Sequence, residues 1–111
     1  MTANRIEIET VKKKISSLDL TYVVKKLCLP PDIGGYSWPK KAAEEVASEY
    51  KKFLLHCYED QLAGKEFTPP PSTVVDIFWH MHILFTKKYH RDCDEIFGFY
   101  LHHDPTYDER F

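Results

Sequence analysis

Apolar residues recur every three or four positions in four stretches of the chain, a spacing typical of helices with one buried face. Residues 5–16 predict a short amphipathic helix, and a second helix follows it as far as Pro30. A long third helix runs from Ser37 to Gly64, and a last one covers residues 87–97. The residues predicted to face the core in these helices are Ile8, Val11 and Ile15; Leu20, Val23, Val24 and Leu27; Val46, Tyr50, Phe53, Leu54 and Cys57; and Tyr89, Cys93, Ile96 and Phe97.

Capping and helix-breaking residues set the predicted boundaries. Ser, Thr and Asp side chains accept hydrogen bonds from the first turn of a helix, and a glycine after the last turn readily adopts the left-handed conformation that ends it. Pro30 and Pro31 stop the second helix, and residues 32–35 form a turn. The predicted N-terminal caps are Ser17 or Asp19, Ser37, Ser72 or Thr73, and Thr86, and the predicted terminating glycines are Gly64 and Gly98.

Residues 74–85 are apolar on nearly every side of a helix, which predicts a central helix with the others packed around it. An acid and two histidines interrupt this apolar run. At about 100° per residue, Asp76 and His80 lie about 40° apart and share a face, whereas His82 lies about 240° from Asp76. We therefore predict a buried, hydrogen-bonded pair of Asp76 and His80, and a position at His82 that tolerates replacement by Phe.

The composition supports one packed domain over residues 1–111. Hydrophobic residues make up 43% of the chain and aromatic residues 14%, enough for a sizeable core and unlike a disordered protein. No stretch shows the clean alternation of a half-buried strand. We expect an all-α, compact bundle of four or five helices, with a buried central helix around residues 74–85 and an irregular C-terminal tail after Gly98.

Charge and cysteine content narrow the class of protein. The 15 basic and 17 acidic side chains give a net charge of −2, which does not favour nucleic acid as a partner. Cys28, Cys57 and Cys93 are odd in number and widely spaced, which argues against a disulfide framework and favours a reducing compartment. No stretch reaches the roughly 20 apolar residues of a membrane-spanning helix. We expect a cytoplasmic protein without nucleic acid or membrane partners.

The second half of the chain resembles a known family. The pattern Pro-Pro-x-x-Val-Val-Asp-x-x-Trp-His-x-His-Ile-Leu begins at Pro70 and is followed by Thr86, Tyr89, Asp92-Cys93, Phe97-Gly98 and Leu101-His102-His103. It resembles the glycine-rich domain-containing-protein-like family, although this chain has no glycine-rich region. Because that family's biochemical activity is not settled, the resemblance implies a fold type and the location of a site rather than a reaction.

Metal binding and catalysis are two alternatives for these residues. His80, Cys93, His102 and His103 are ligand types that suit zinc, with Asp76 as a further ligand or as the group that orients His80. Cys93, His80 and Asp76 are also the types of a nucleophile, its base and an orienting acid. The competing interpretation is a core histidine held by Asp76, a core cysteine and surface histidines. Cys93 falls on an apolar face, where a buried thiol is unreactive. The sequence therefore favours a protein that is not an enzyme and that has no cofactor, with bound zinc as the alternative.

Association with another protein is the function that the sequence favours. A small helical domain commonly acts by presenting a surface, here to a partner that it regulates, to an enzyme that it inhibits, or to a second copy in a homodimer. Aromatic side chains are the usual anchors of such interfaces. The predicted anchors are Tyr100, Tyr107 and Phe111 in the tail, together with Trp79, for which a place in the core is the competing interpretation.

Overall fold

Five α-helices and one 3₁₀ turn form between residues 5 and 104, the part of the chain that the computed structural model describes. No strand forms in that part, so the prediction of an all-α bundle of four or five helices is confirmed. The elements are α1 (Arg5–Ser16), α2 (Thr21–Cys28), η1 (Pro31–Ile33), α3 (Lys40–Leu62), α4 (Thr73–Leu84) and α5 (Thr86–Phe97).

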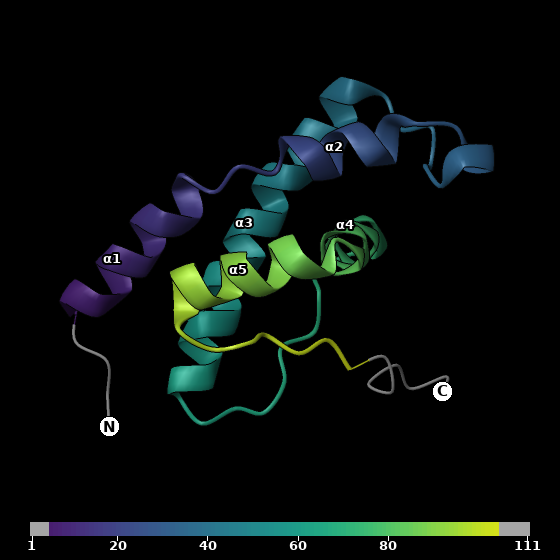
Figure 1. The fold of residues 1–111 in the computed structure, drawn as a ribbon. Helices are drawn as coiled ribbons and strands as arrows, with labels where there is room; N and C mark the ends of the chain where they lie inside the picture. The colour runs from purple at the N-terminus through teal and green to yellow at the C-terminus, as the bar shows by residue number, and fades with distance from the viewer. Residues whose placement is uncertain (1–4, 105–111) are drawn as a thin grey trace.

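Three of the other four helices pack against α4, which is the buried position that the apolar run in its sequence predicted. α4 contacts α2, α3 and α5, while α1 packs against α3 and α5. Figure 1 shows α3 as the long helix behind the others, with α5 crossing in front of it and the segment after α5 running back beneath α5. No helix between residues 5 and 104 has the length and apolarity needed to cross a membrane.

One continuous cluster of apolar side chains forms the core, and the predicted stripes supply most of it. Residues of every predicted stripe are buried, and Ile8, Val24, Val46 and Phe97 are partly buried beside them. α4 is more one-sided than its sequence suggested, because Val74 and Leu84 are exposed. Its inward face consists of Val75, Phe78, Trp79, Met81 and His82.

The helix ends confirm some of the predicted caps and correct others. The Ser72 hydroxyl accepts a hydrogen bond from the Val75 N–H, and Gly98 ends α5 in the left-handed conformation with φ 77°. The predictions for Ser37 and Thr86 were wrong. Ser37 lies in the loop before α3 with φ 53°, and Pro39 is the residue that precedes the first turn. Thr86 is the first residue of α5, and its side chain does not cap that helix.

Candidate functional site

A buried polar network centres on His82, which is only 2% exposed. Its Nε2 lies 3.0 Å from Asp92 Oδ2, and its Nδ1 lies 2.7 Å from the Tyr50 hydroxyl. A carboxylate can only accept, so Nε2 carries the proton that is donated to Asp92, and Nδ1 accepts from the Tyr50 O–H. Tyr22 donates a second hydrogen bond, of 2.9 Å, to Asp92 Oδ2. Four elements, α2, α3, α4 and α5, therefore meet through one imidazole and one carboxylate.

The electrostatics of this network favour an ionised Asp92. Burial alone would raise the pKa of its carboxyl, but hydrogen bonds from His82 and Tyr22, together with the nearby Arg91, outweigh burial and lower that pKa below its usual value. Burial raises the pKa of Tyr50 and of Tyr22, and both remain neutral donors at physiological pH. The network thus combines one buried anion with donors that satisfy it, which is how a charge is kept in a protein interior.

The predicted pair of Asp76 and His80 does not form. The two residues share a helix face, as the wheel predicted, but that face turns outward, so His80 is exposed and Asp76 is only partly buried. The face on the opposite side carries the large apolar residues Phe78 and Trp79, whose burial determines how α4 is rotated. His82 lies on that inward face, so the prediction that it tolerates replacement by Phe has lost its geometric basis.

A second network ties the segment after α5 to the core. The Trp79 Nε1–H donates to the Tyr89 hydroxyl at 3.0 Å, and that hydroxyl donates to the Leu101 carbonyl. Two residues further on, His103 Nε2 lies 2.7 Å from Asp76 Oδ1. The His103 ring also stacks on the Trp79 indole with centroids 4.0 Å apart and the planes 1° from parallel. These contacts hold residues 99–104 in an extended course along the bundle.

Trp79 belongs to the core and not to an interface, which corrects its inclusion among the anchors. Its side chain is 2% exposed and is covered by Phe53 on one side and by His103 on another. Tyr100, by contrast, is 38% exposed and packs against the rings of Tyr89 and His102. The other two predicted anchors, Tyr107 and Phe111, lie outside the described residues.

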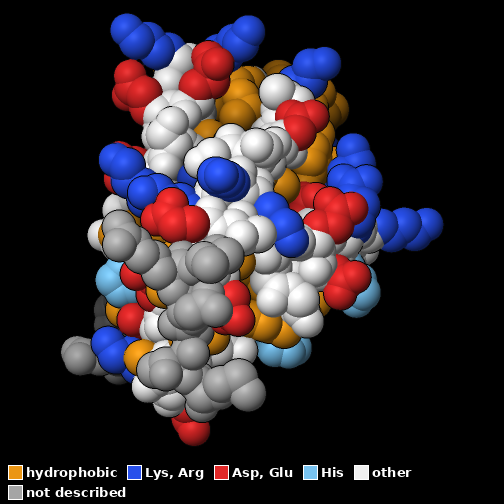
Figure 2. Space-filling model, turned by 90° about the vertical axis from the view of Figure 1, so that its left-hand side faces the viewer, with side chains coloured by type: hydrophobic (Ala, Val, Ile, Leu, Met, Phe, Trp, Pro, Cys, Tyr) orange, Lys and Arg blue, Asp and Glu red, His pale blue; other side chains and the backbone are white. Residues whose placement is uncertain are grey.

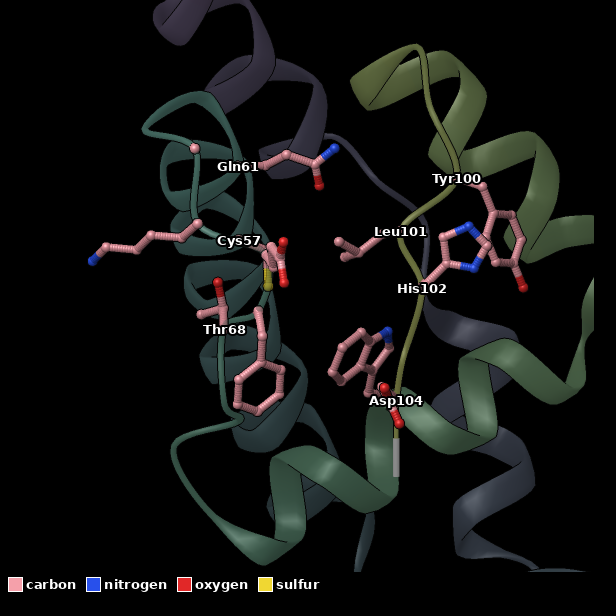
Figure 3. Close-up of a pocket in the computed structure, with 12 residues that line it drawn as sticks. Cys57, Gln61, Thr68, Tyr100, Leu101, His102 and Asp104 are labelled. Atoms are coloured by element: carbon pink, nitrogen blue, oxygen red, sulfur yellow. The ribbon is translucent and has the colours of Figure 1, made fainter. Parts of the chain in front are cut away.

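A cleft of about 460 Å³ opens between the end of α3, the connector after it and residues 99–104. Figure 3 shows Leu101 pointing from the extended segment toward the α3 side, where Cys57 lies, while Tyr100 and His102 lie together on the other side of that segment. The lining combines apolar and polar side chains. Its residues are Cys57, Gln61, Gly64, Lys65, Glu66, Phe67, Thr68, Trp79, Tyr100, Leu101, His102 and Asp104.

The two cysteines nearest this region are poor nucleophiles. Burial raises the pKa of the Cys57 thiol to about 12, and burial also raises the pKa of the Cys93 thiol. Both thiols are therefore protonated at neutral pH, and the thiolate is the reactive form. Cys93 lies in the core beside Tyr89 and Leu101, on the apolar face where its spacing predicted it.

The four predicted zinc ligands do not converge. His80 is exposed on α4, Cys93 is buried on α5, the His102 ring lies tilted against the Tyr100 ring, and His103 is hydrogen-bonded to Asp76. Between residues 5 and 104, no group of three or more His, Cys, Asp or Glu side chains is arranged to hold a metal ion. The structure therefore contradicts the predicted ligand set, because the outward rotation of α4 separates His80 from Cys93.

The residues that sequence reasoning missed are Tyr22, Tyr50 and Asp92. Asp92 appeared only as part of the family pattern, Tyr50 appeared only as a core position of the long third helix, and Tyr22 was not singled out. The pairs that they form span 10 to 70 positions of sequence. The helical wheel contained one usable signal, since His82 falls among the large apolar residues of α4.

Comparison with known proteins assigns the chain to a family. Residues 36–108 match the family described as UCP032817-like, and because this match covers more than half of the chain, the protein belongs to that family. The matched segment contains both polar networks except for Tyr22, and it contains the whole cleft. Neither the curated proteins nor the solved structures gave a match. The resemblance to the glycine-rich domain-containing-protein-like family stays a prediction.

Proposed function

We propose that this protein is a protein-binding, regulatory module that acts by association, and that the cleft beside residues 99–104 receives its partner. The observation that carries the proposal is the fixed wall of this cleft. Hydrogen bonds from Tyr89 to Leu101 and between His103 and Asp76 hold the extended segment in place. A wall that is already ordered loses little conformational entropy on binding, which favours affinity.

The lining of the cleft suits a short segment of another protein. Phe67 and Leu101 provide apolar contact, while Gln61 and Lys65 provide polar groups at the exposed edge. Its volume falls in the range of about 300–1,000 Å³ that is typical of ligand pockets. Tyr100 stands beside the cleft with an apolar ring and a polar hydroxyl, the combination that makes tyrosine frequent at interfaces.

The zinc- or cysteine-dependent hydrolase that the sequence kept as an alternative has less support. Its proposed base, His80, lies on the outer face of α4, and its proposed nucleophile, Cys93, is a buried thiol with a raised pKa. The two histidine–acid pairs, His82 with Asp92 in the interior and His103 with Asp76 nearer the surface, are hydrogen-bonded to each other. We also propose a cytoplasmic location, because all three cysteines are free thiols.

Site-specific photo-crosslinking in the native cells tests this function. A photoreactive benzoylphenylalanine replaces Gln61 or Tyr100, which line the cleft, and in a control it replaces Lys12 on the exposed side of α1. We expect a discrete protein adduct from the two cleft positions and not from position 12. An adduct of twice the chain's mass identifies a second copy as the partner. The proposal fails if the cleft positions give no more adduct than the control.

A further inference from the structure

The loop between α2 and α3 exposes three large apolar side chains close together in the sequence. We call residues 29–38 the 29–38 loop. Leu29 is 38% exposed, Ile33 53% and Tyr36 45%. Figure 1 shows that η1, at the tip of this loop, is the element that extends furthest from the body of the bundle on that side. Clustered apolar exposure of this kind marks an interaction surface more often than scattered single residues do.

Close packing at a glycine and several hydrogen bonds fix the backbone of the 29–38 loop, on which these side chains are exposed. A Cβ on Gly35 would lie 1.9 Å from the Leu29 carbonyl oxygen, so only glycine permits this close approach. The Lys26 ammonium donates to the Ile33 carbonyl at 2.8 Å, and the N–H groups of Tyr36 and Trp38 donate to the Leu27 carbonyl. The loop therefore presents a preformed apolar tip at the end of two helices.

Lysines flank this apolar tip on both sides. Lys25 and Lys26 lie in the last turn of α2, and Lys40 and Lys41 begin α3. Asp32, within the 3₁₀ turn, is the one acidic residue between Tyr22 and Ala43. Residues 22–43 thus have a net charge of +3, four lysines against Asp32, although the whole chain has a net charge of −2 and Asp19 and Glu44 line the same hollow as Lys25 and Lys40. An apolar tip with a positively charged surround is complementary to an anionic surface that has an apolar interior.

We propose that the 29–38 loop binds the surface of an anionic lipid bilayer. Leu29, Ile33 and Tyr36 enter the boundary between headgroups and acyl chains, and the flanking lysines face the lipid phosphates and carboxylates. A projecting tip favours a bilayer over a folded protein, because lipids rearrange around a convex surface while a protein must supply a matching groove. The sequence predicted no membrane partner because no segment is long enough to span a bilayer, whereas this peripheral contact requires only a tip. It does not depend on the proposed function of the cleft.

Co-sedimentation of the whole protein with vesicles tests the proposal. We expect binding to phosphatidylcholine vesicles that contain phosphatidylserine, little binding to phosphatidylcholine alone, and weaker binding at high salt. The triple variant Lys25→Gln, Lys40→Gln and Lys41→Gln leaves Lys26 in place to hold the loop. It should lower partitioning by about fivefold for each lysine removed. Leu29→Ser with Ile33→Ser should lower partitioning at least about tenfold.

Matched variants separate this effect from unfolding. Lys12→Gln, Lys13→Gln and Lys14→Gln remove three exposed charges from α1, where Figure 2 shows Lys and Arg side chains mixed with Asp and Glu, and should leave vesicle binding nearly unchanged. Asp32→Lys should strengthen binding to vesicles that contain phosphatidylserine while the midpoint of thermal unfolding stays unchanged. The proposal is overturned if the triple lysine variant in α1 weakens vesicle binding as much as the triple lysine variant around the loop does. It is also overturned if the protein shows no preference for vesicles that contain phosphatidylserine. Tyr100→Ser, beside the cleft, should not alter vesicle binding, and the loop variants should not alter the adduct formed at position 61.

Discussion

His82 is the residue at which the interior polar network can be tested most directly. Replacing it by Phe removes the donor to the buried Asp92 carboxylate and the acceptor of the Tyr50 hydroxyl. Because both partners stay buried, we expect His82→Phe to lower the free energy of unfolding by about 2–4 kcal/mol. Urea denaturation measures this loss. His80→Phe, on the exposed side of the same helix, is the control and should change stability by less than about 0.5 kcal/mol. Equal effects of the two variants would contradict the buried network.

Asp92 makes the stability of the fold depend on pH in the acidic range. Its pKa in the folded protein is lower than that of a free aspartate, which is about 3.9. The ionised carboxylate therefore stabilises the fold above about pH 4, and this contribution is lost as the pH falls through the lower folded pKa. Asp92→Asn removes it, so the variant should be less stable than the wild type at pH 7, by a margin that narrows below pH 4. A margin that stays constant from pH 7 to pH 2.5 would show that the carboxylate is not the stabilising species.

The helical wheel of α4 shows what the sequence could and could not predict at this scale. The relation among Asp76, His80 and His82 was correct, because it depends only on helix geometry. The choice of the buried face was wrong, because Val74, Ile77, Ile83 and Leu84 are also apolar and hide the difference between the two sides. Asp76 finds its partner in His103, which is 27 positions away, and only the course of the chain after α5 brings the two together.

The spacing of apolar residues predicted the helices well, but it did not predict the structure of the 29–38 loop. The buried stripes arise from spacing within one helix, which is why Tyr50, Cys57 and Tyr89 lie in the core where they were predicted. The helix that was predicted to begin at Ser37 begins at Lys40. Between them, Ser37 donates its N–H to the Leu29 carbonyl and Trp38 donates to the Leu27 carbonyl. These hydrogen bonds to the end of α2 keep Ser37 and Trp38 out of the helix. They join residues that are eight to eleven positions apart, so the local sequence does not predict them.

Gly35 is the position that tests how tightly the 29–38 loop is built. The Cβ of an alanine there would lie 1.9 Å from the Leu29 carbonyl oxygen. The backbone on one side of the loop must therefore move, which weakens the hydrogen bonds to α2. We expect Gly35→Ala to lower the free energy of unfolding by about 2 kcal/mol or more. Gly64→Ala is the matched control, because it has φ +82° but open space around it, and it should cost about 1–2 kcal/mol from backbone strain alone. If Gly35→Ala cost no more than Gly64→Ala, the loop would be adaptable rather than preformed.

At the scale of the whole molecule, the segment after α5 connects the interior to the candidate binding surface. Tyr89 links the two, because its hydroxyl accepts a hydrogen bond from Trp79 in the core and donates one to the Leu101 carbonyl in the wall of the cleft. The family pattern in the sequence contained Trp79, Tyr89, Leu101 and His103, but it could not show that they act together. Their common task in this structure is to attach an extended segment to a helical bundle. The residues of the family pattern thus position the wall of the cleft as well as form part of the core.

Removal of the last seven residues separates folding from association. Both polar networks and the cleft lie between residues 5 and 104, so truncation after Asp104 leaves their hydrogen bonds in place. We expect the midpoint of thermal unfolding to fall by less than about 5 °C, a loss below about 1 kcal/mol for a domain of this size. The truncation also removes Tyr107 and Phe111, two of the predicted aromatic anchors, and should weaken self-association or partner capture by about tenfold or more. Sedimentation velocity and the adduct formed at position 61 measure that loss, and differential scanning calorimetry measures stability. A truncated chain that unfolds at much lower temperature yet associates normally would show that the tail completes the core.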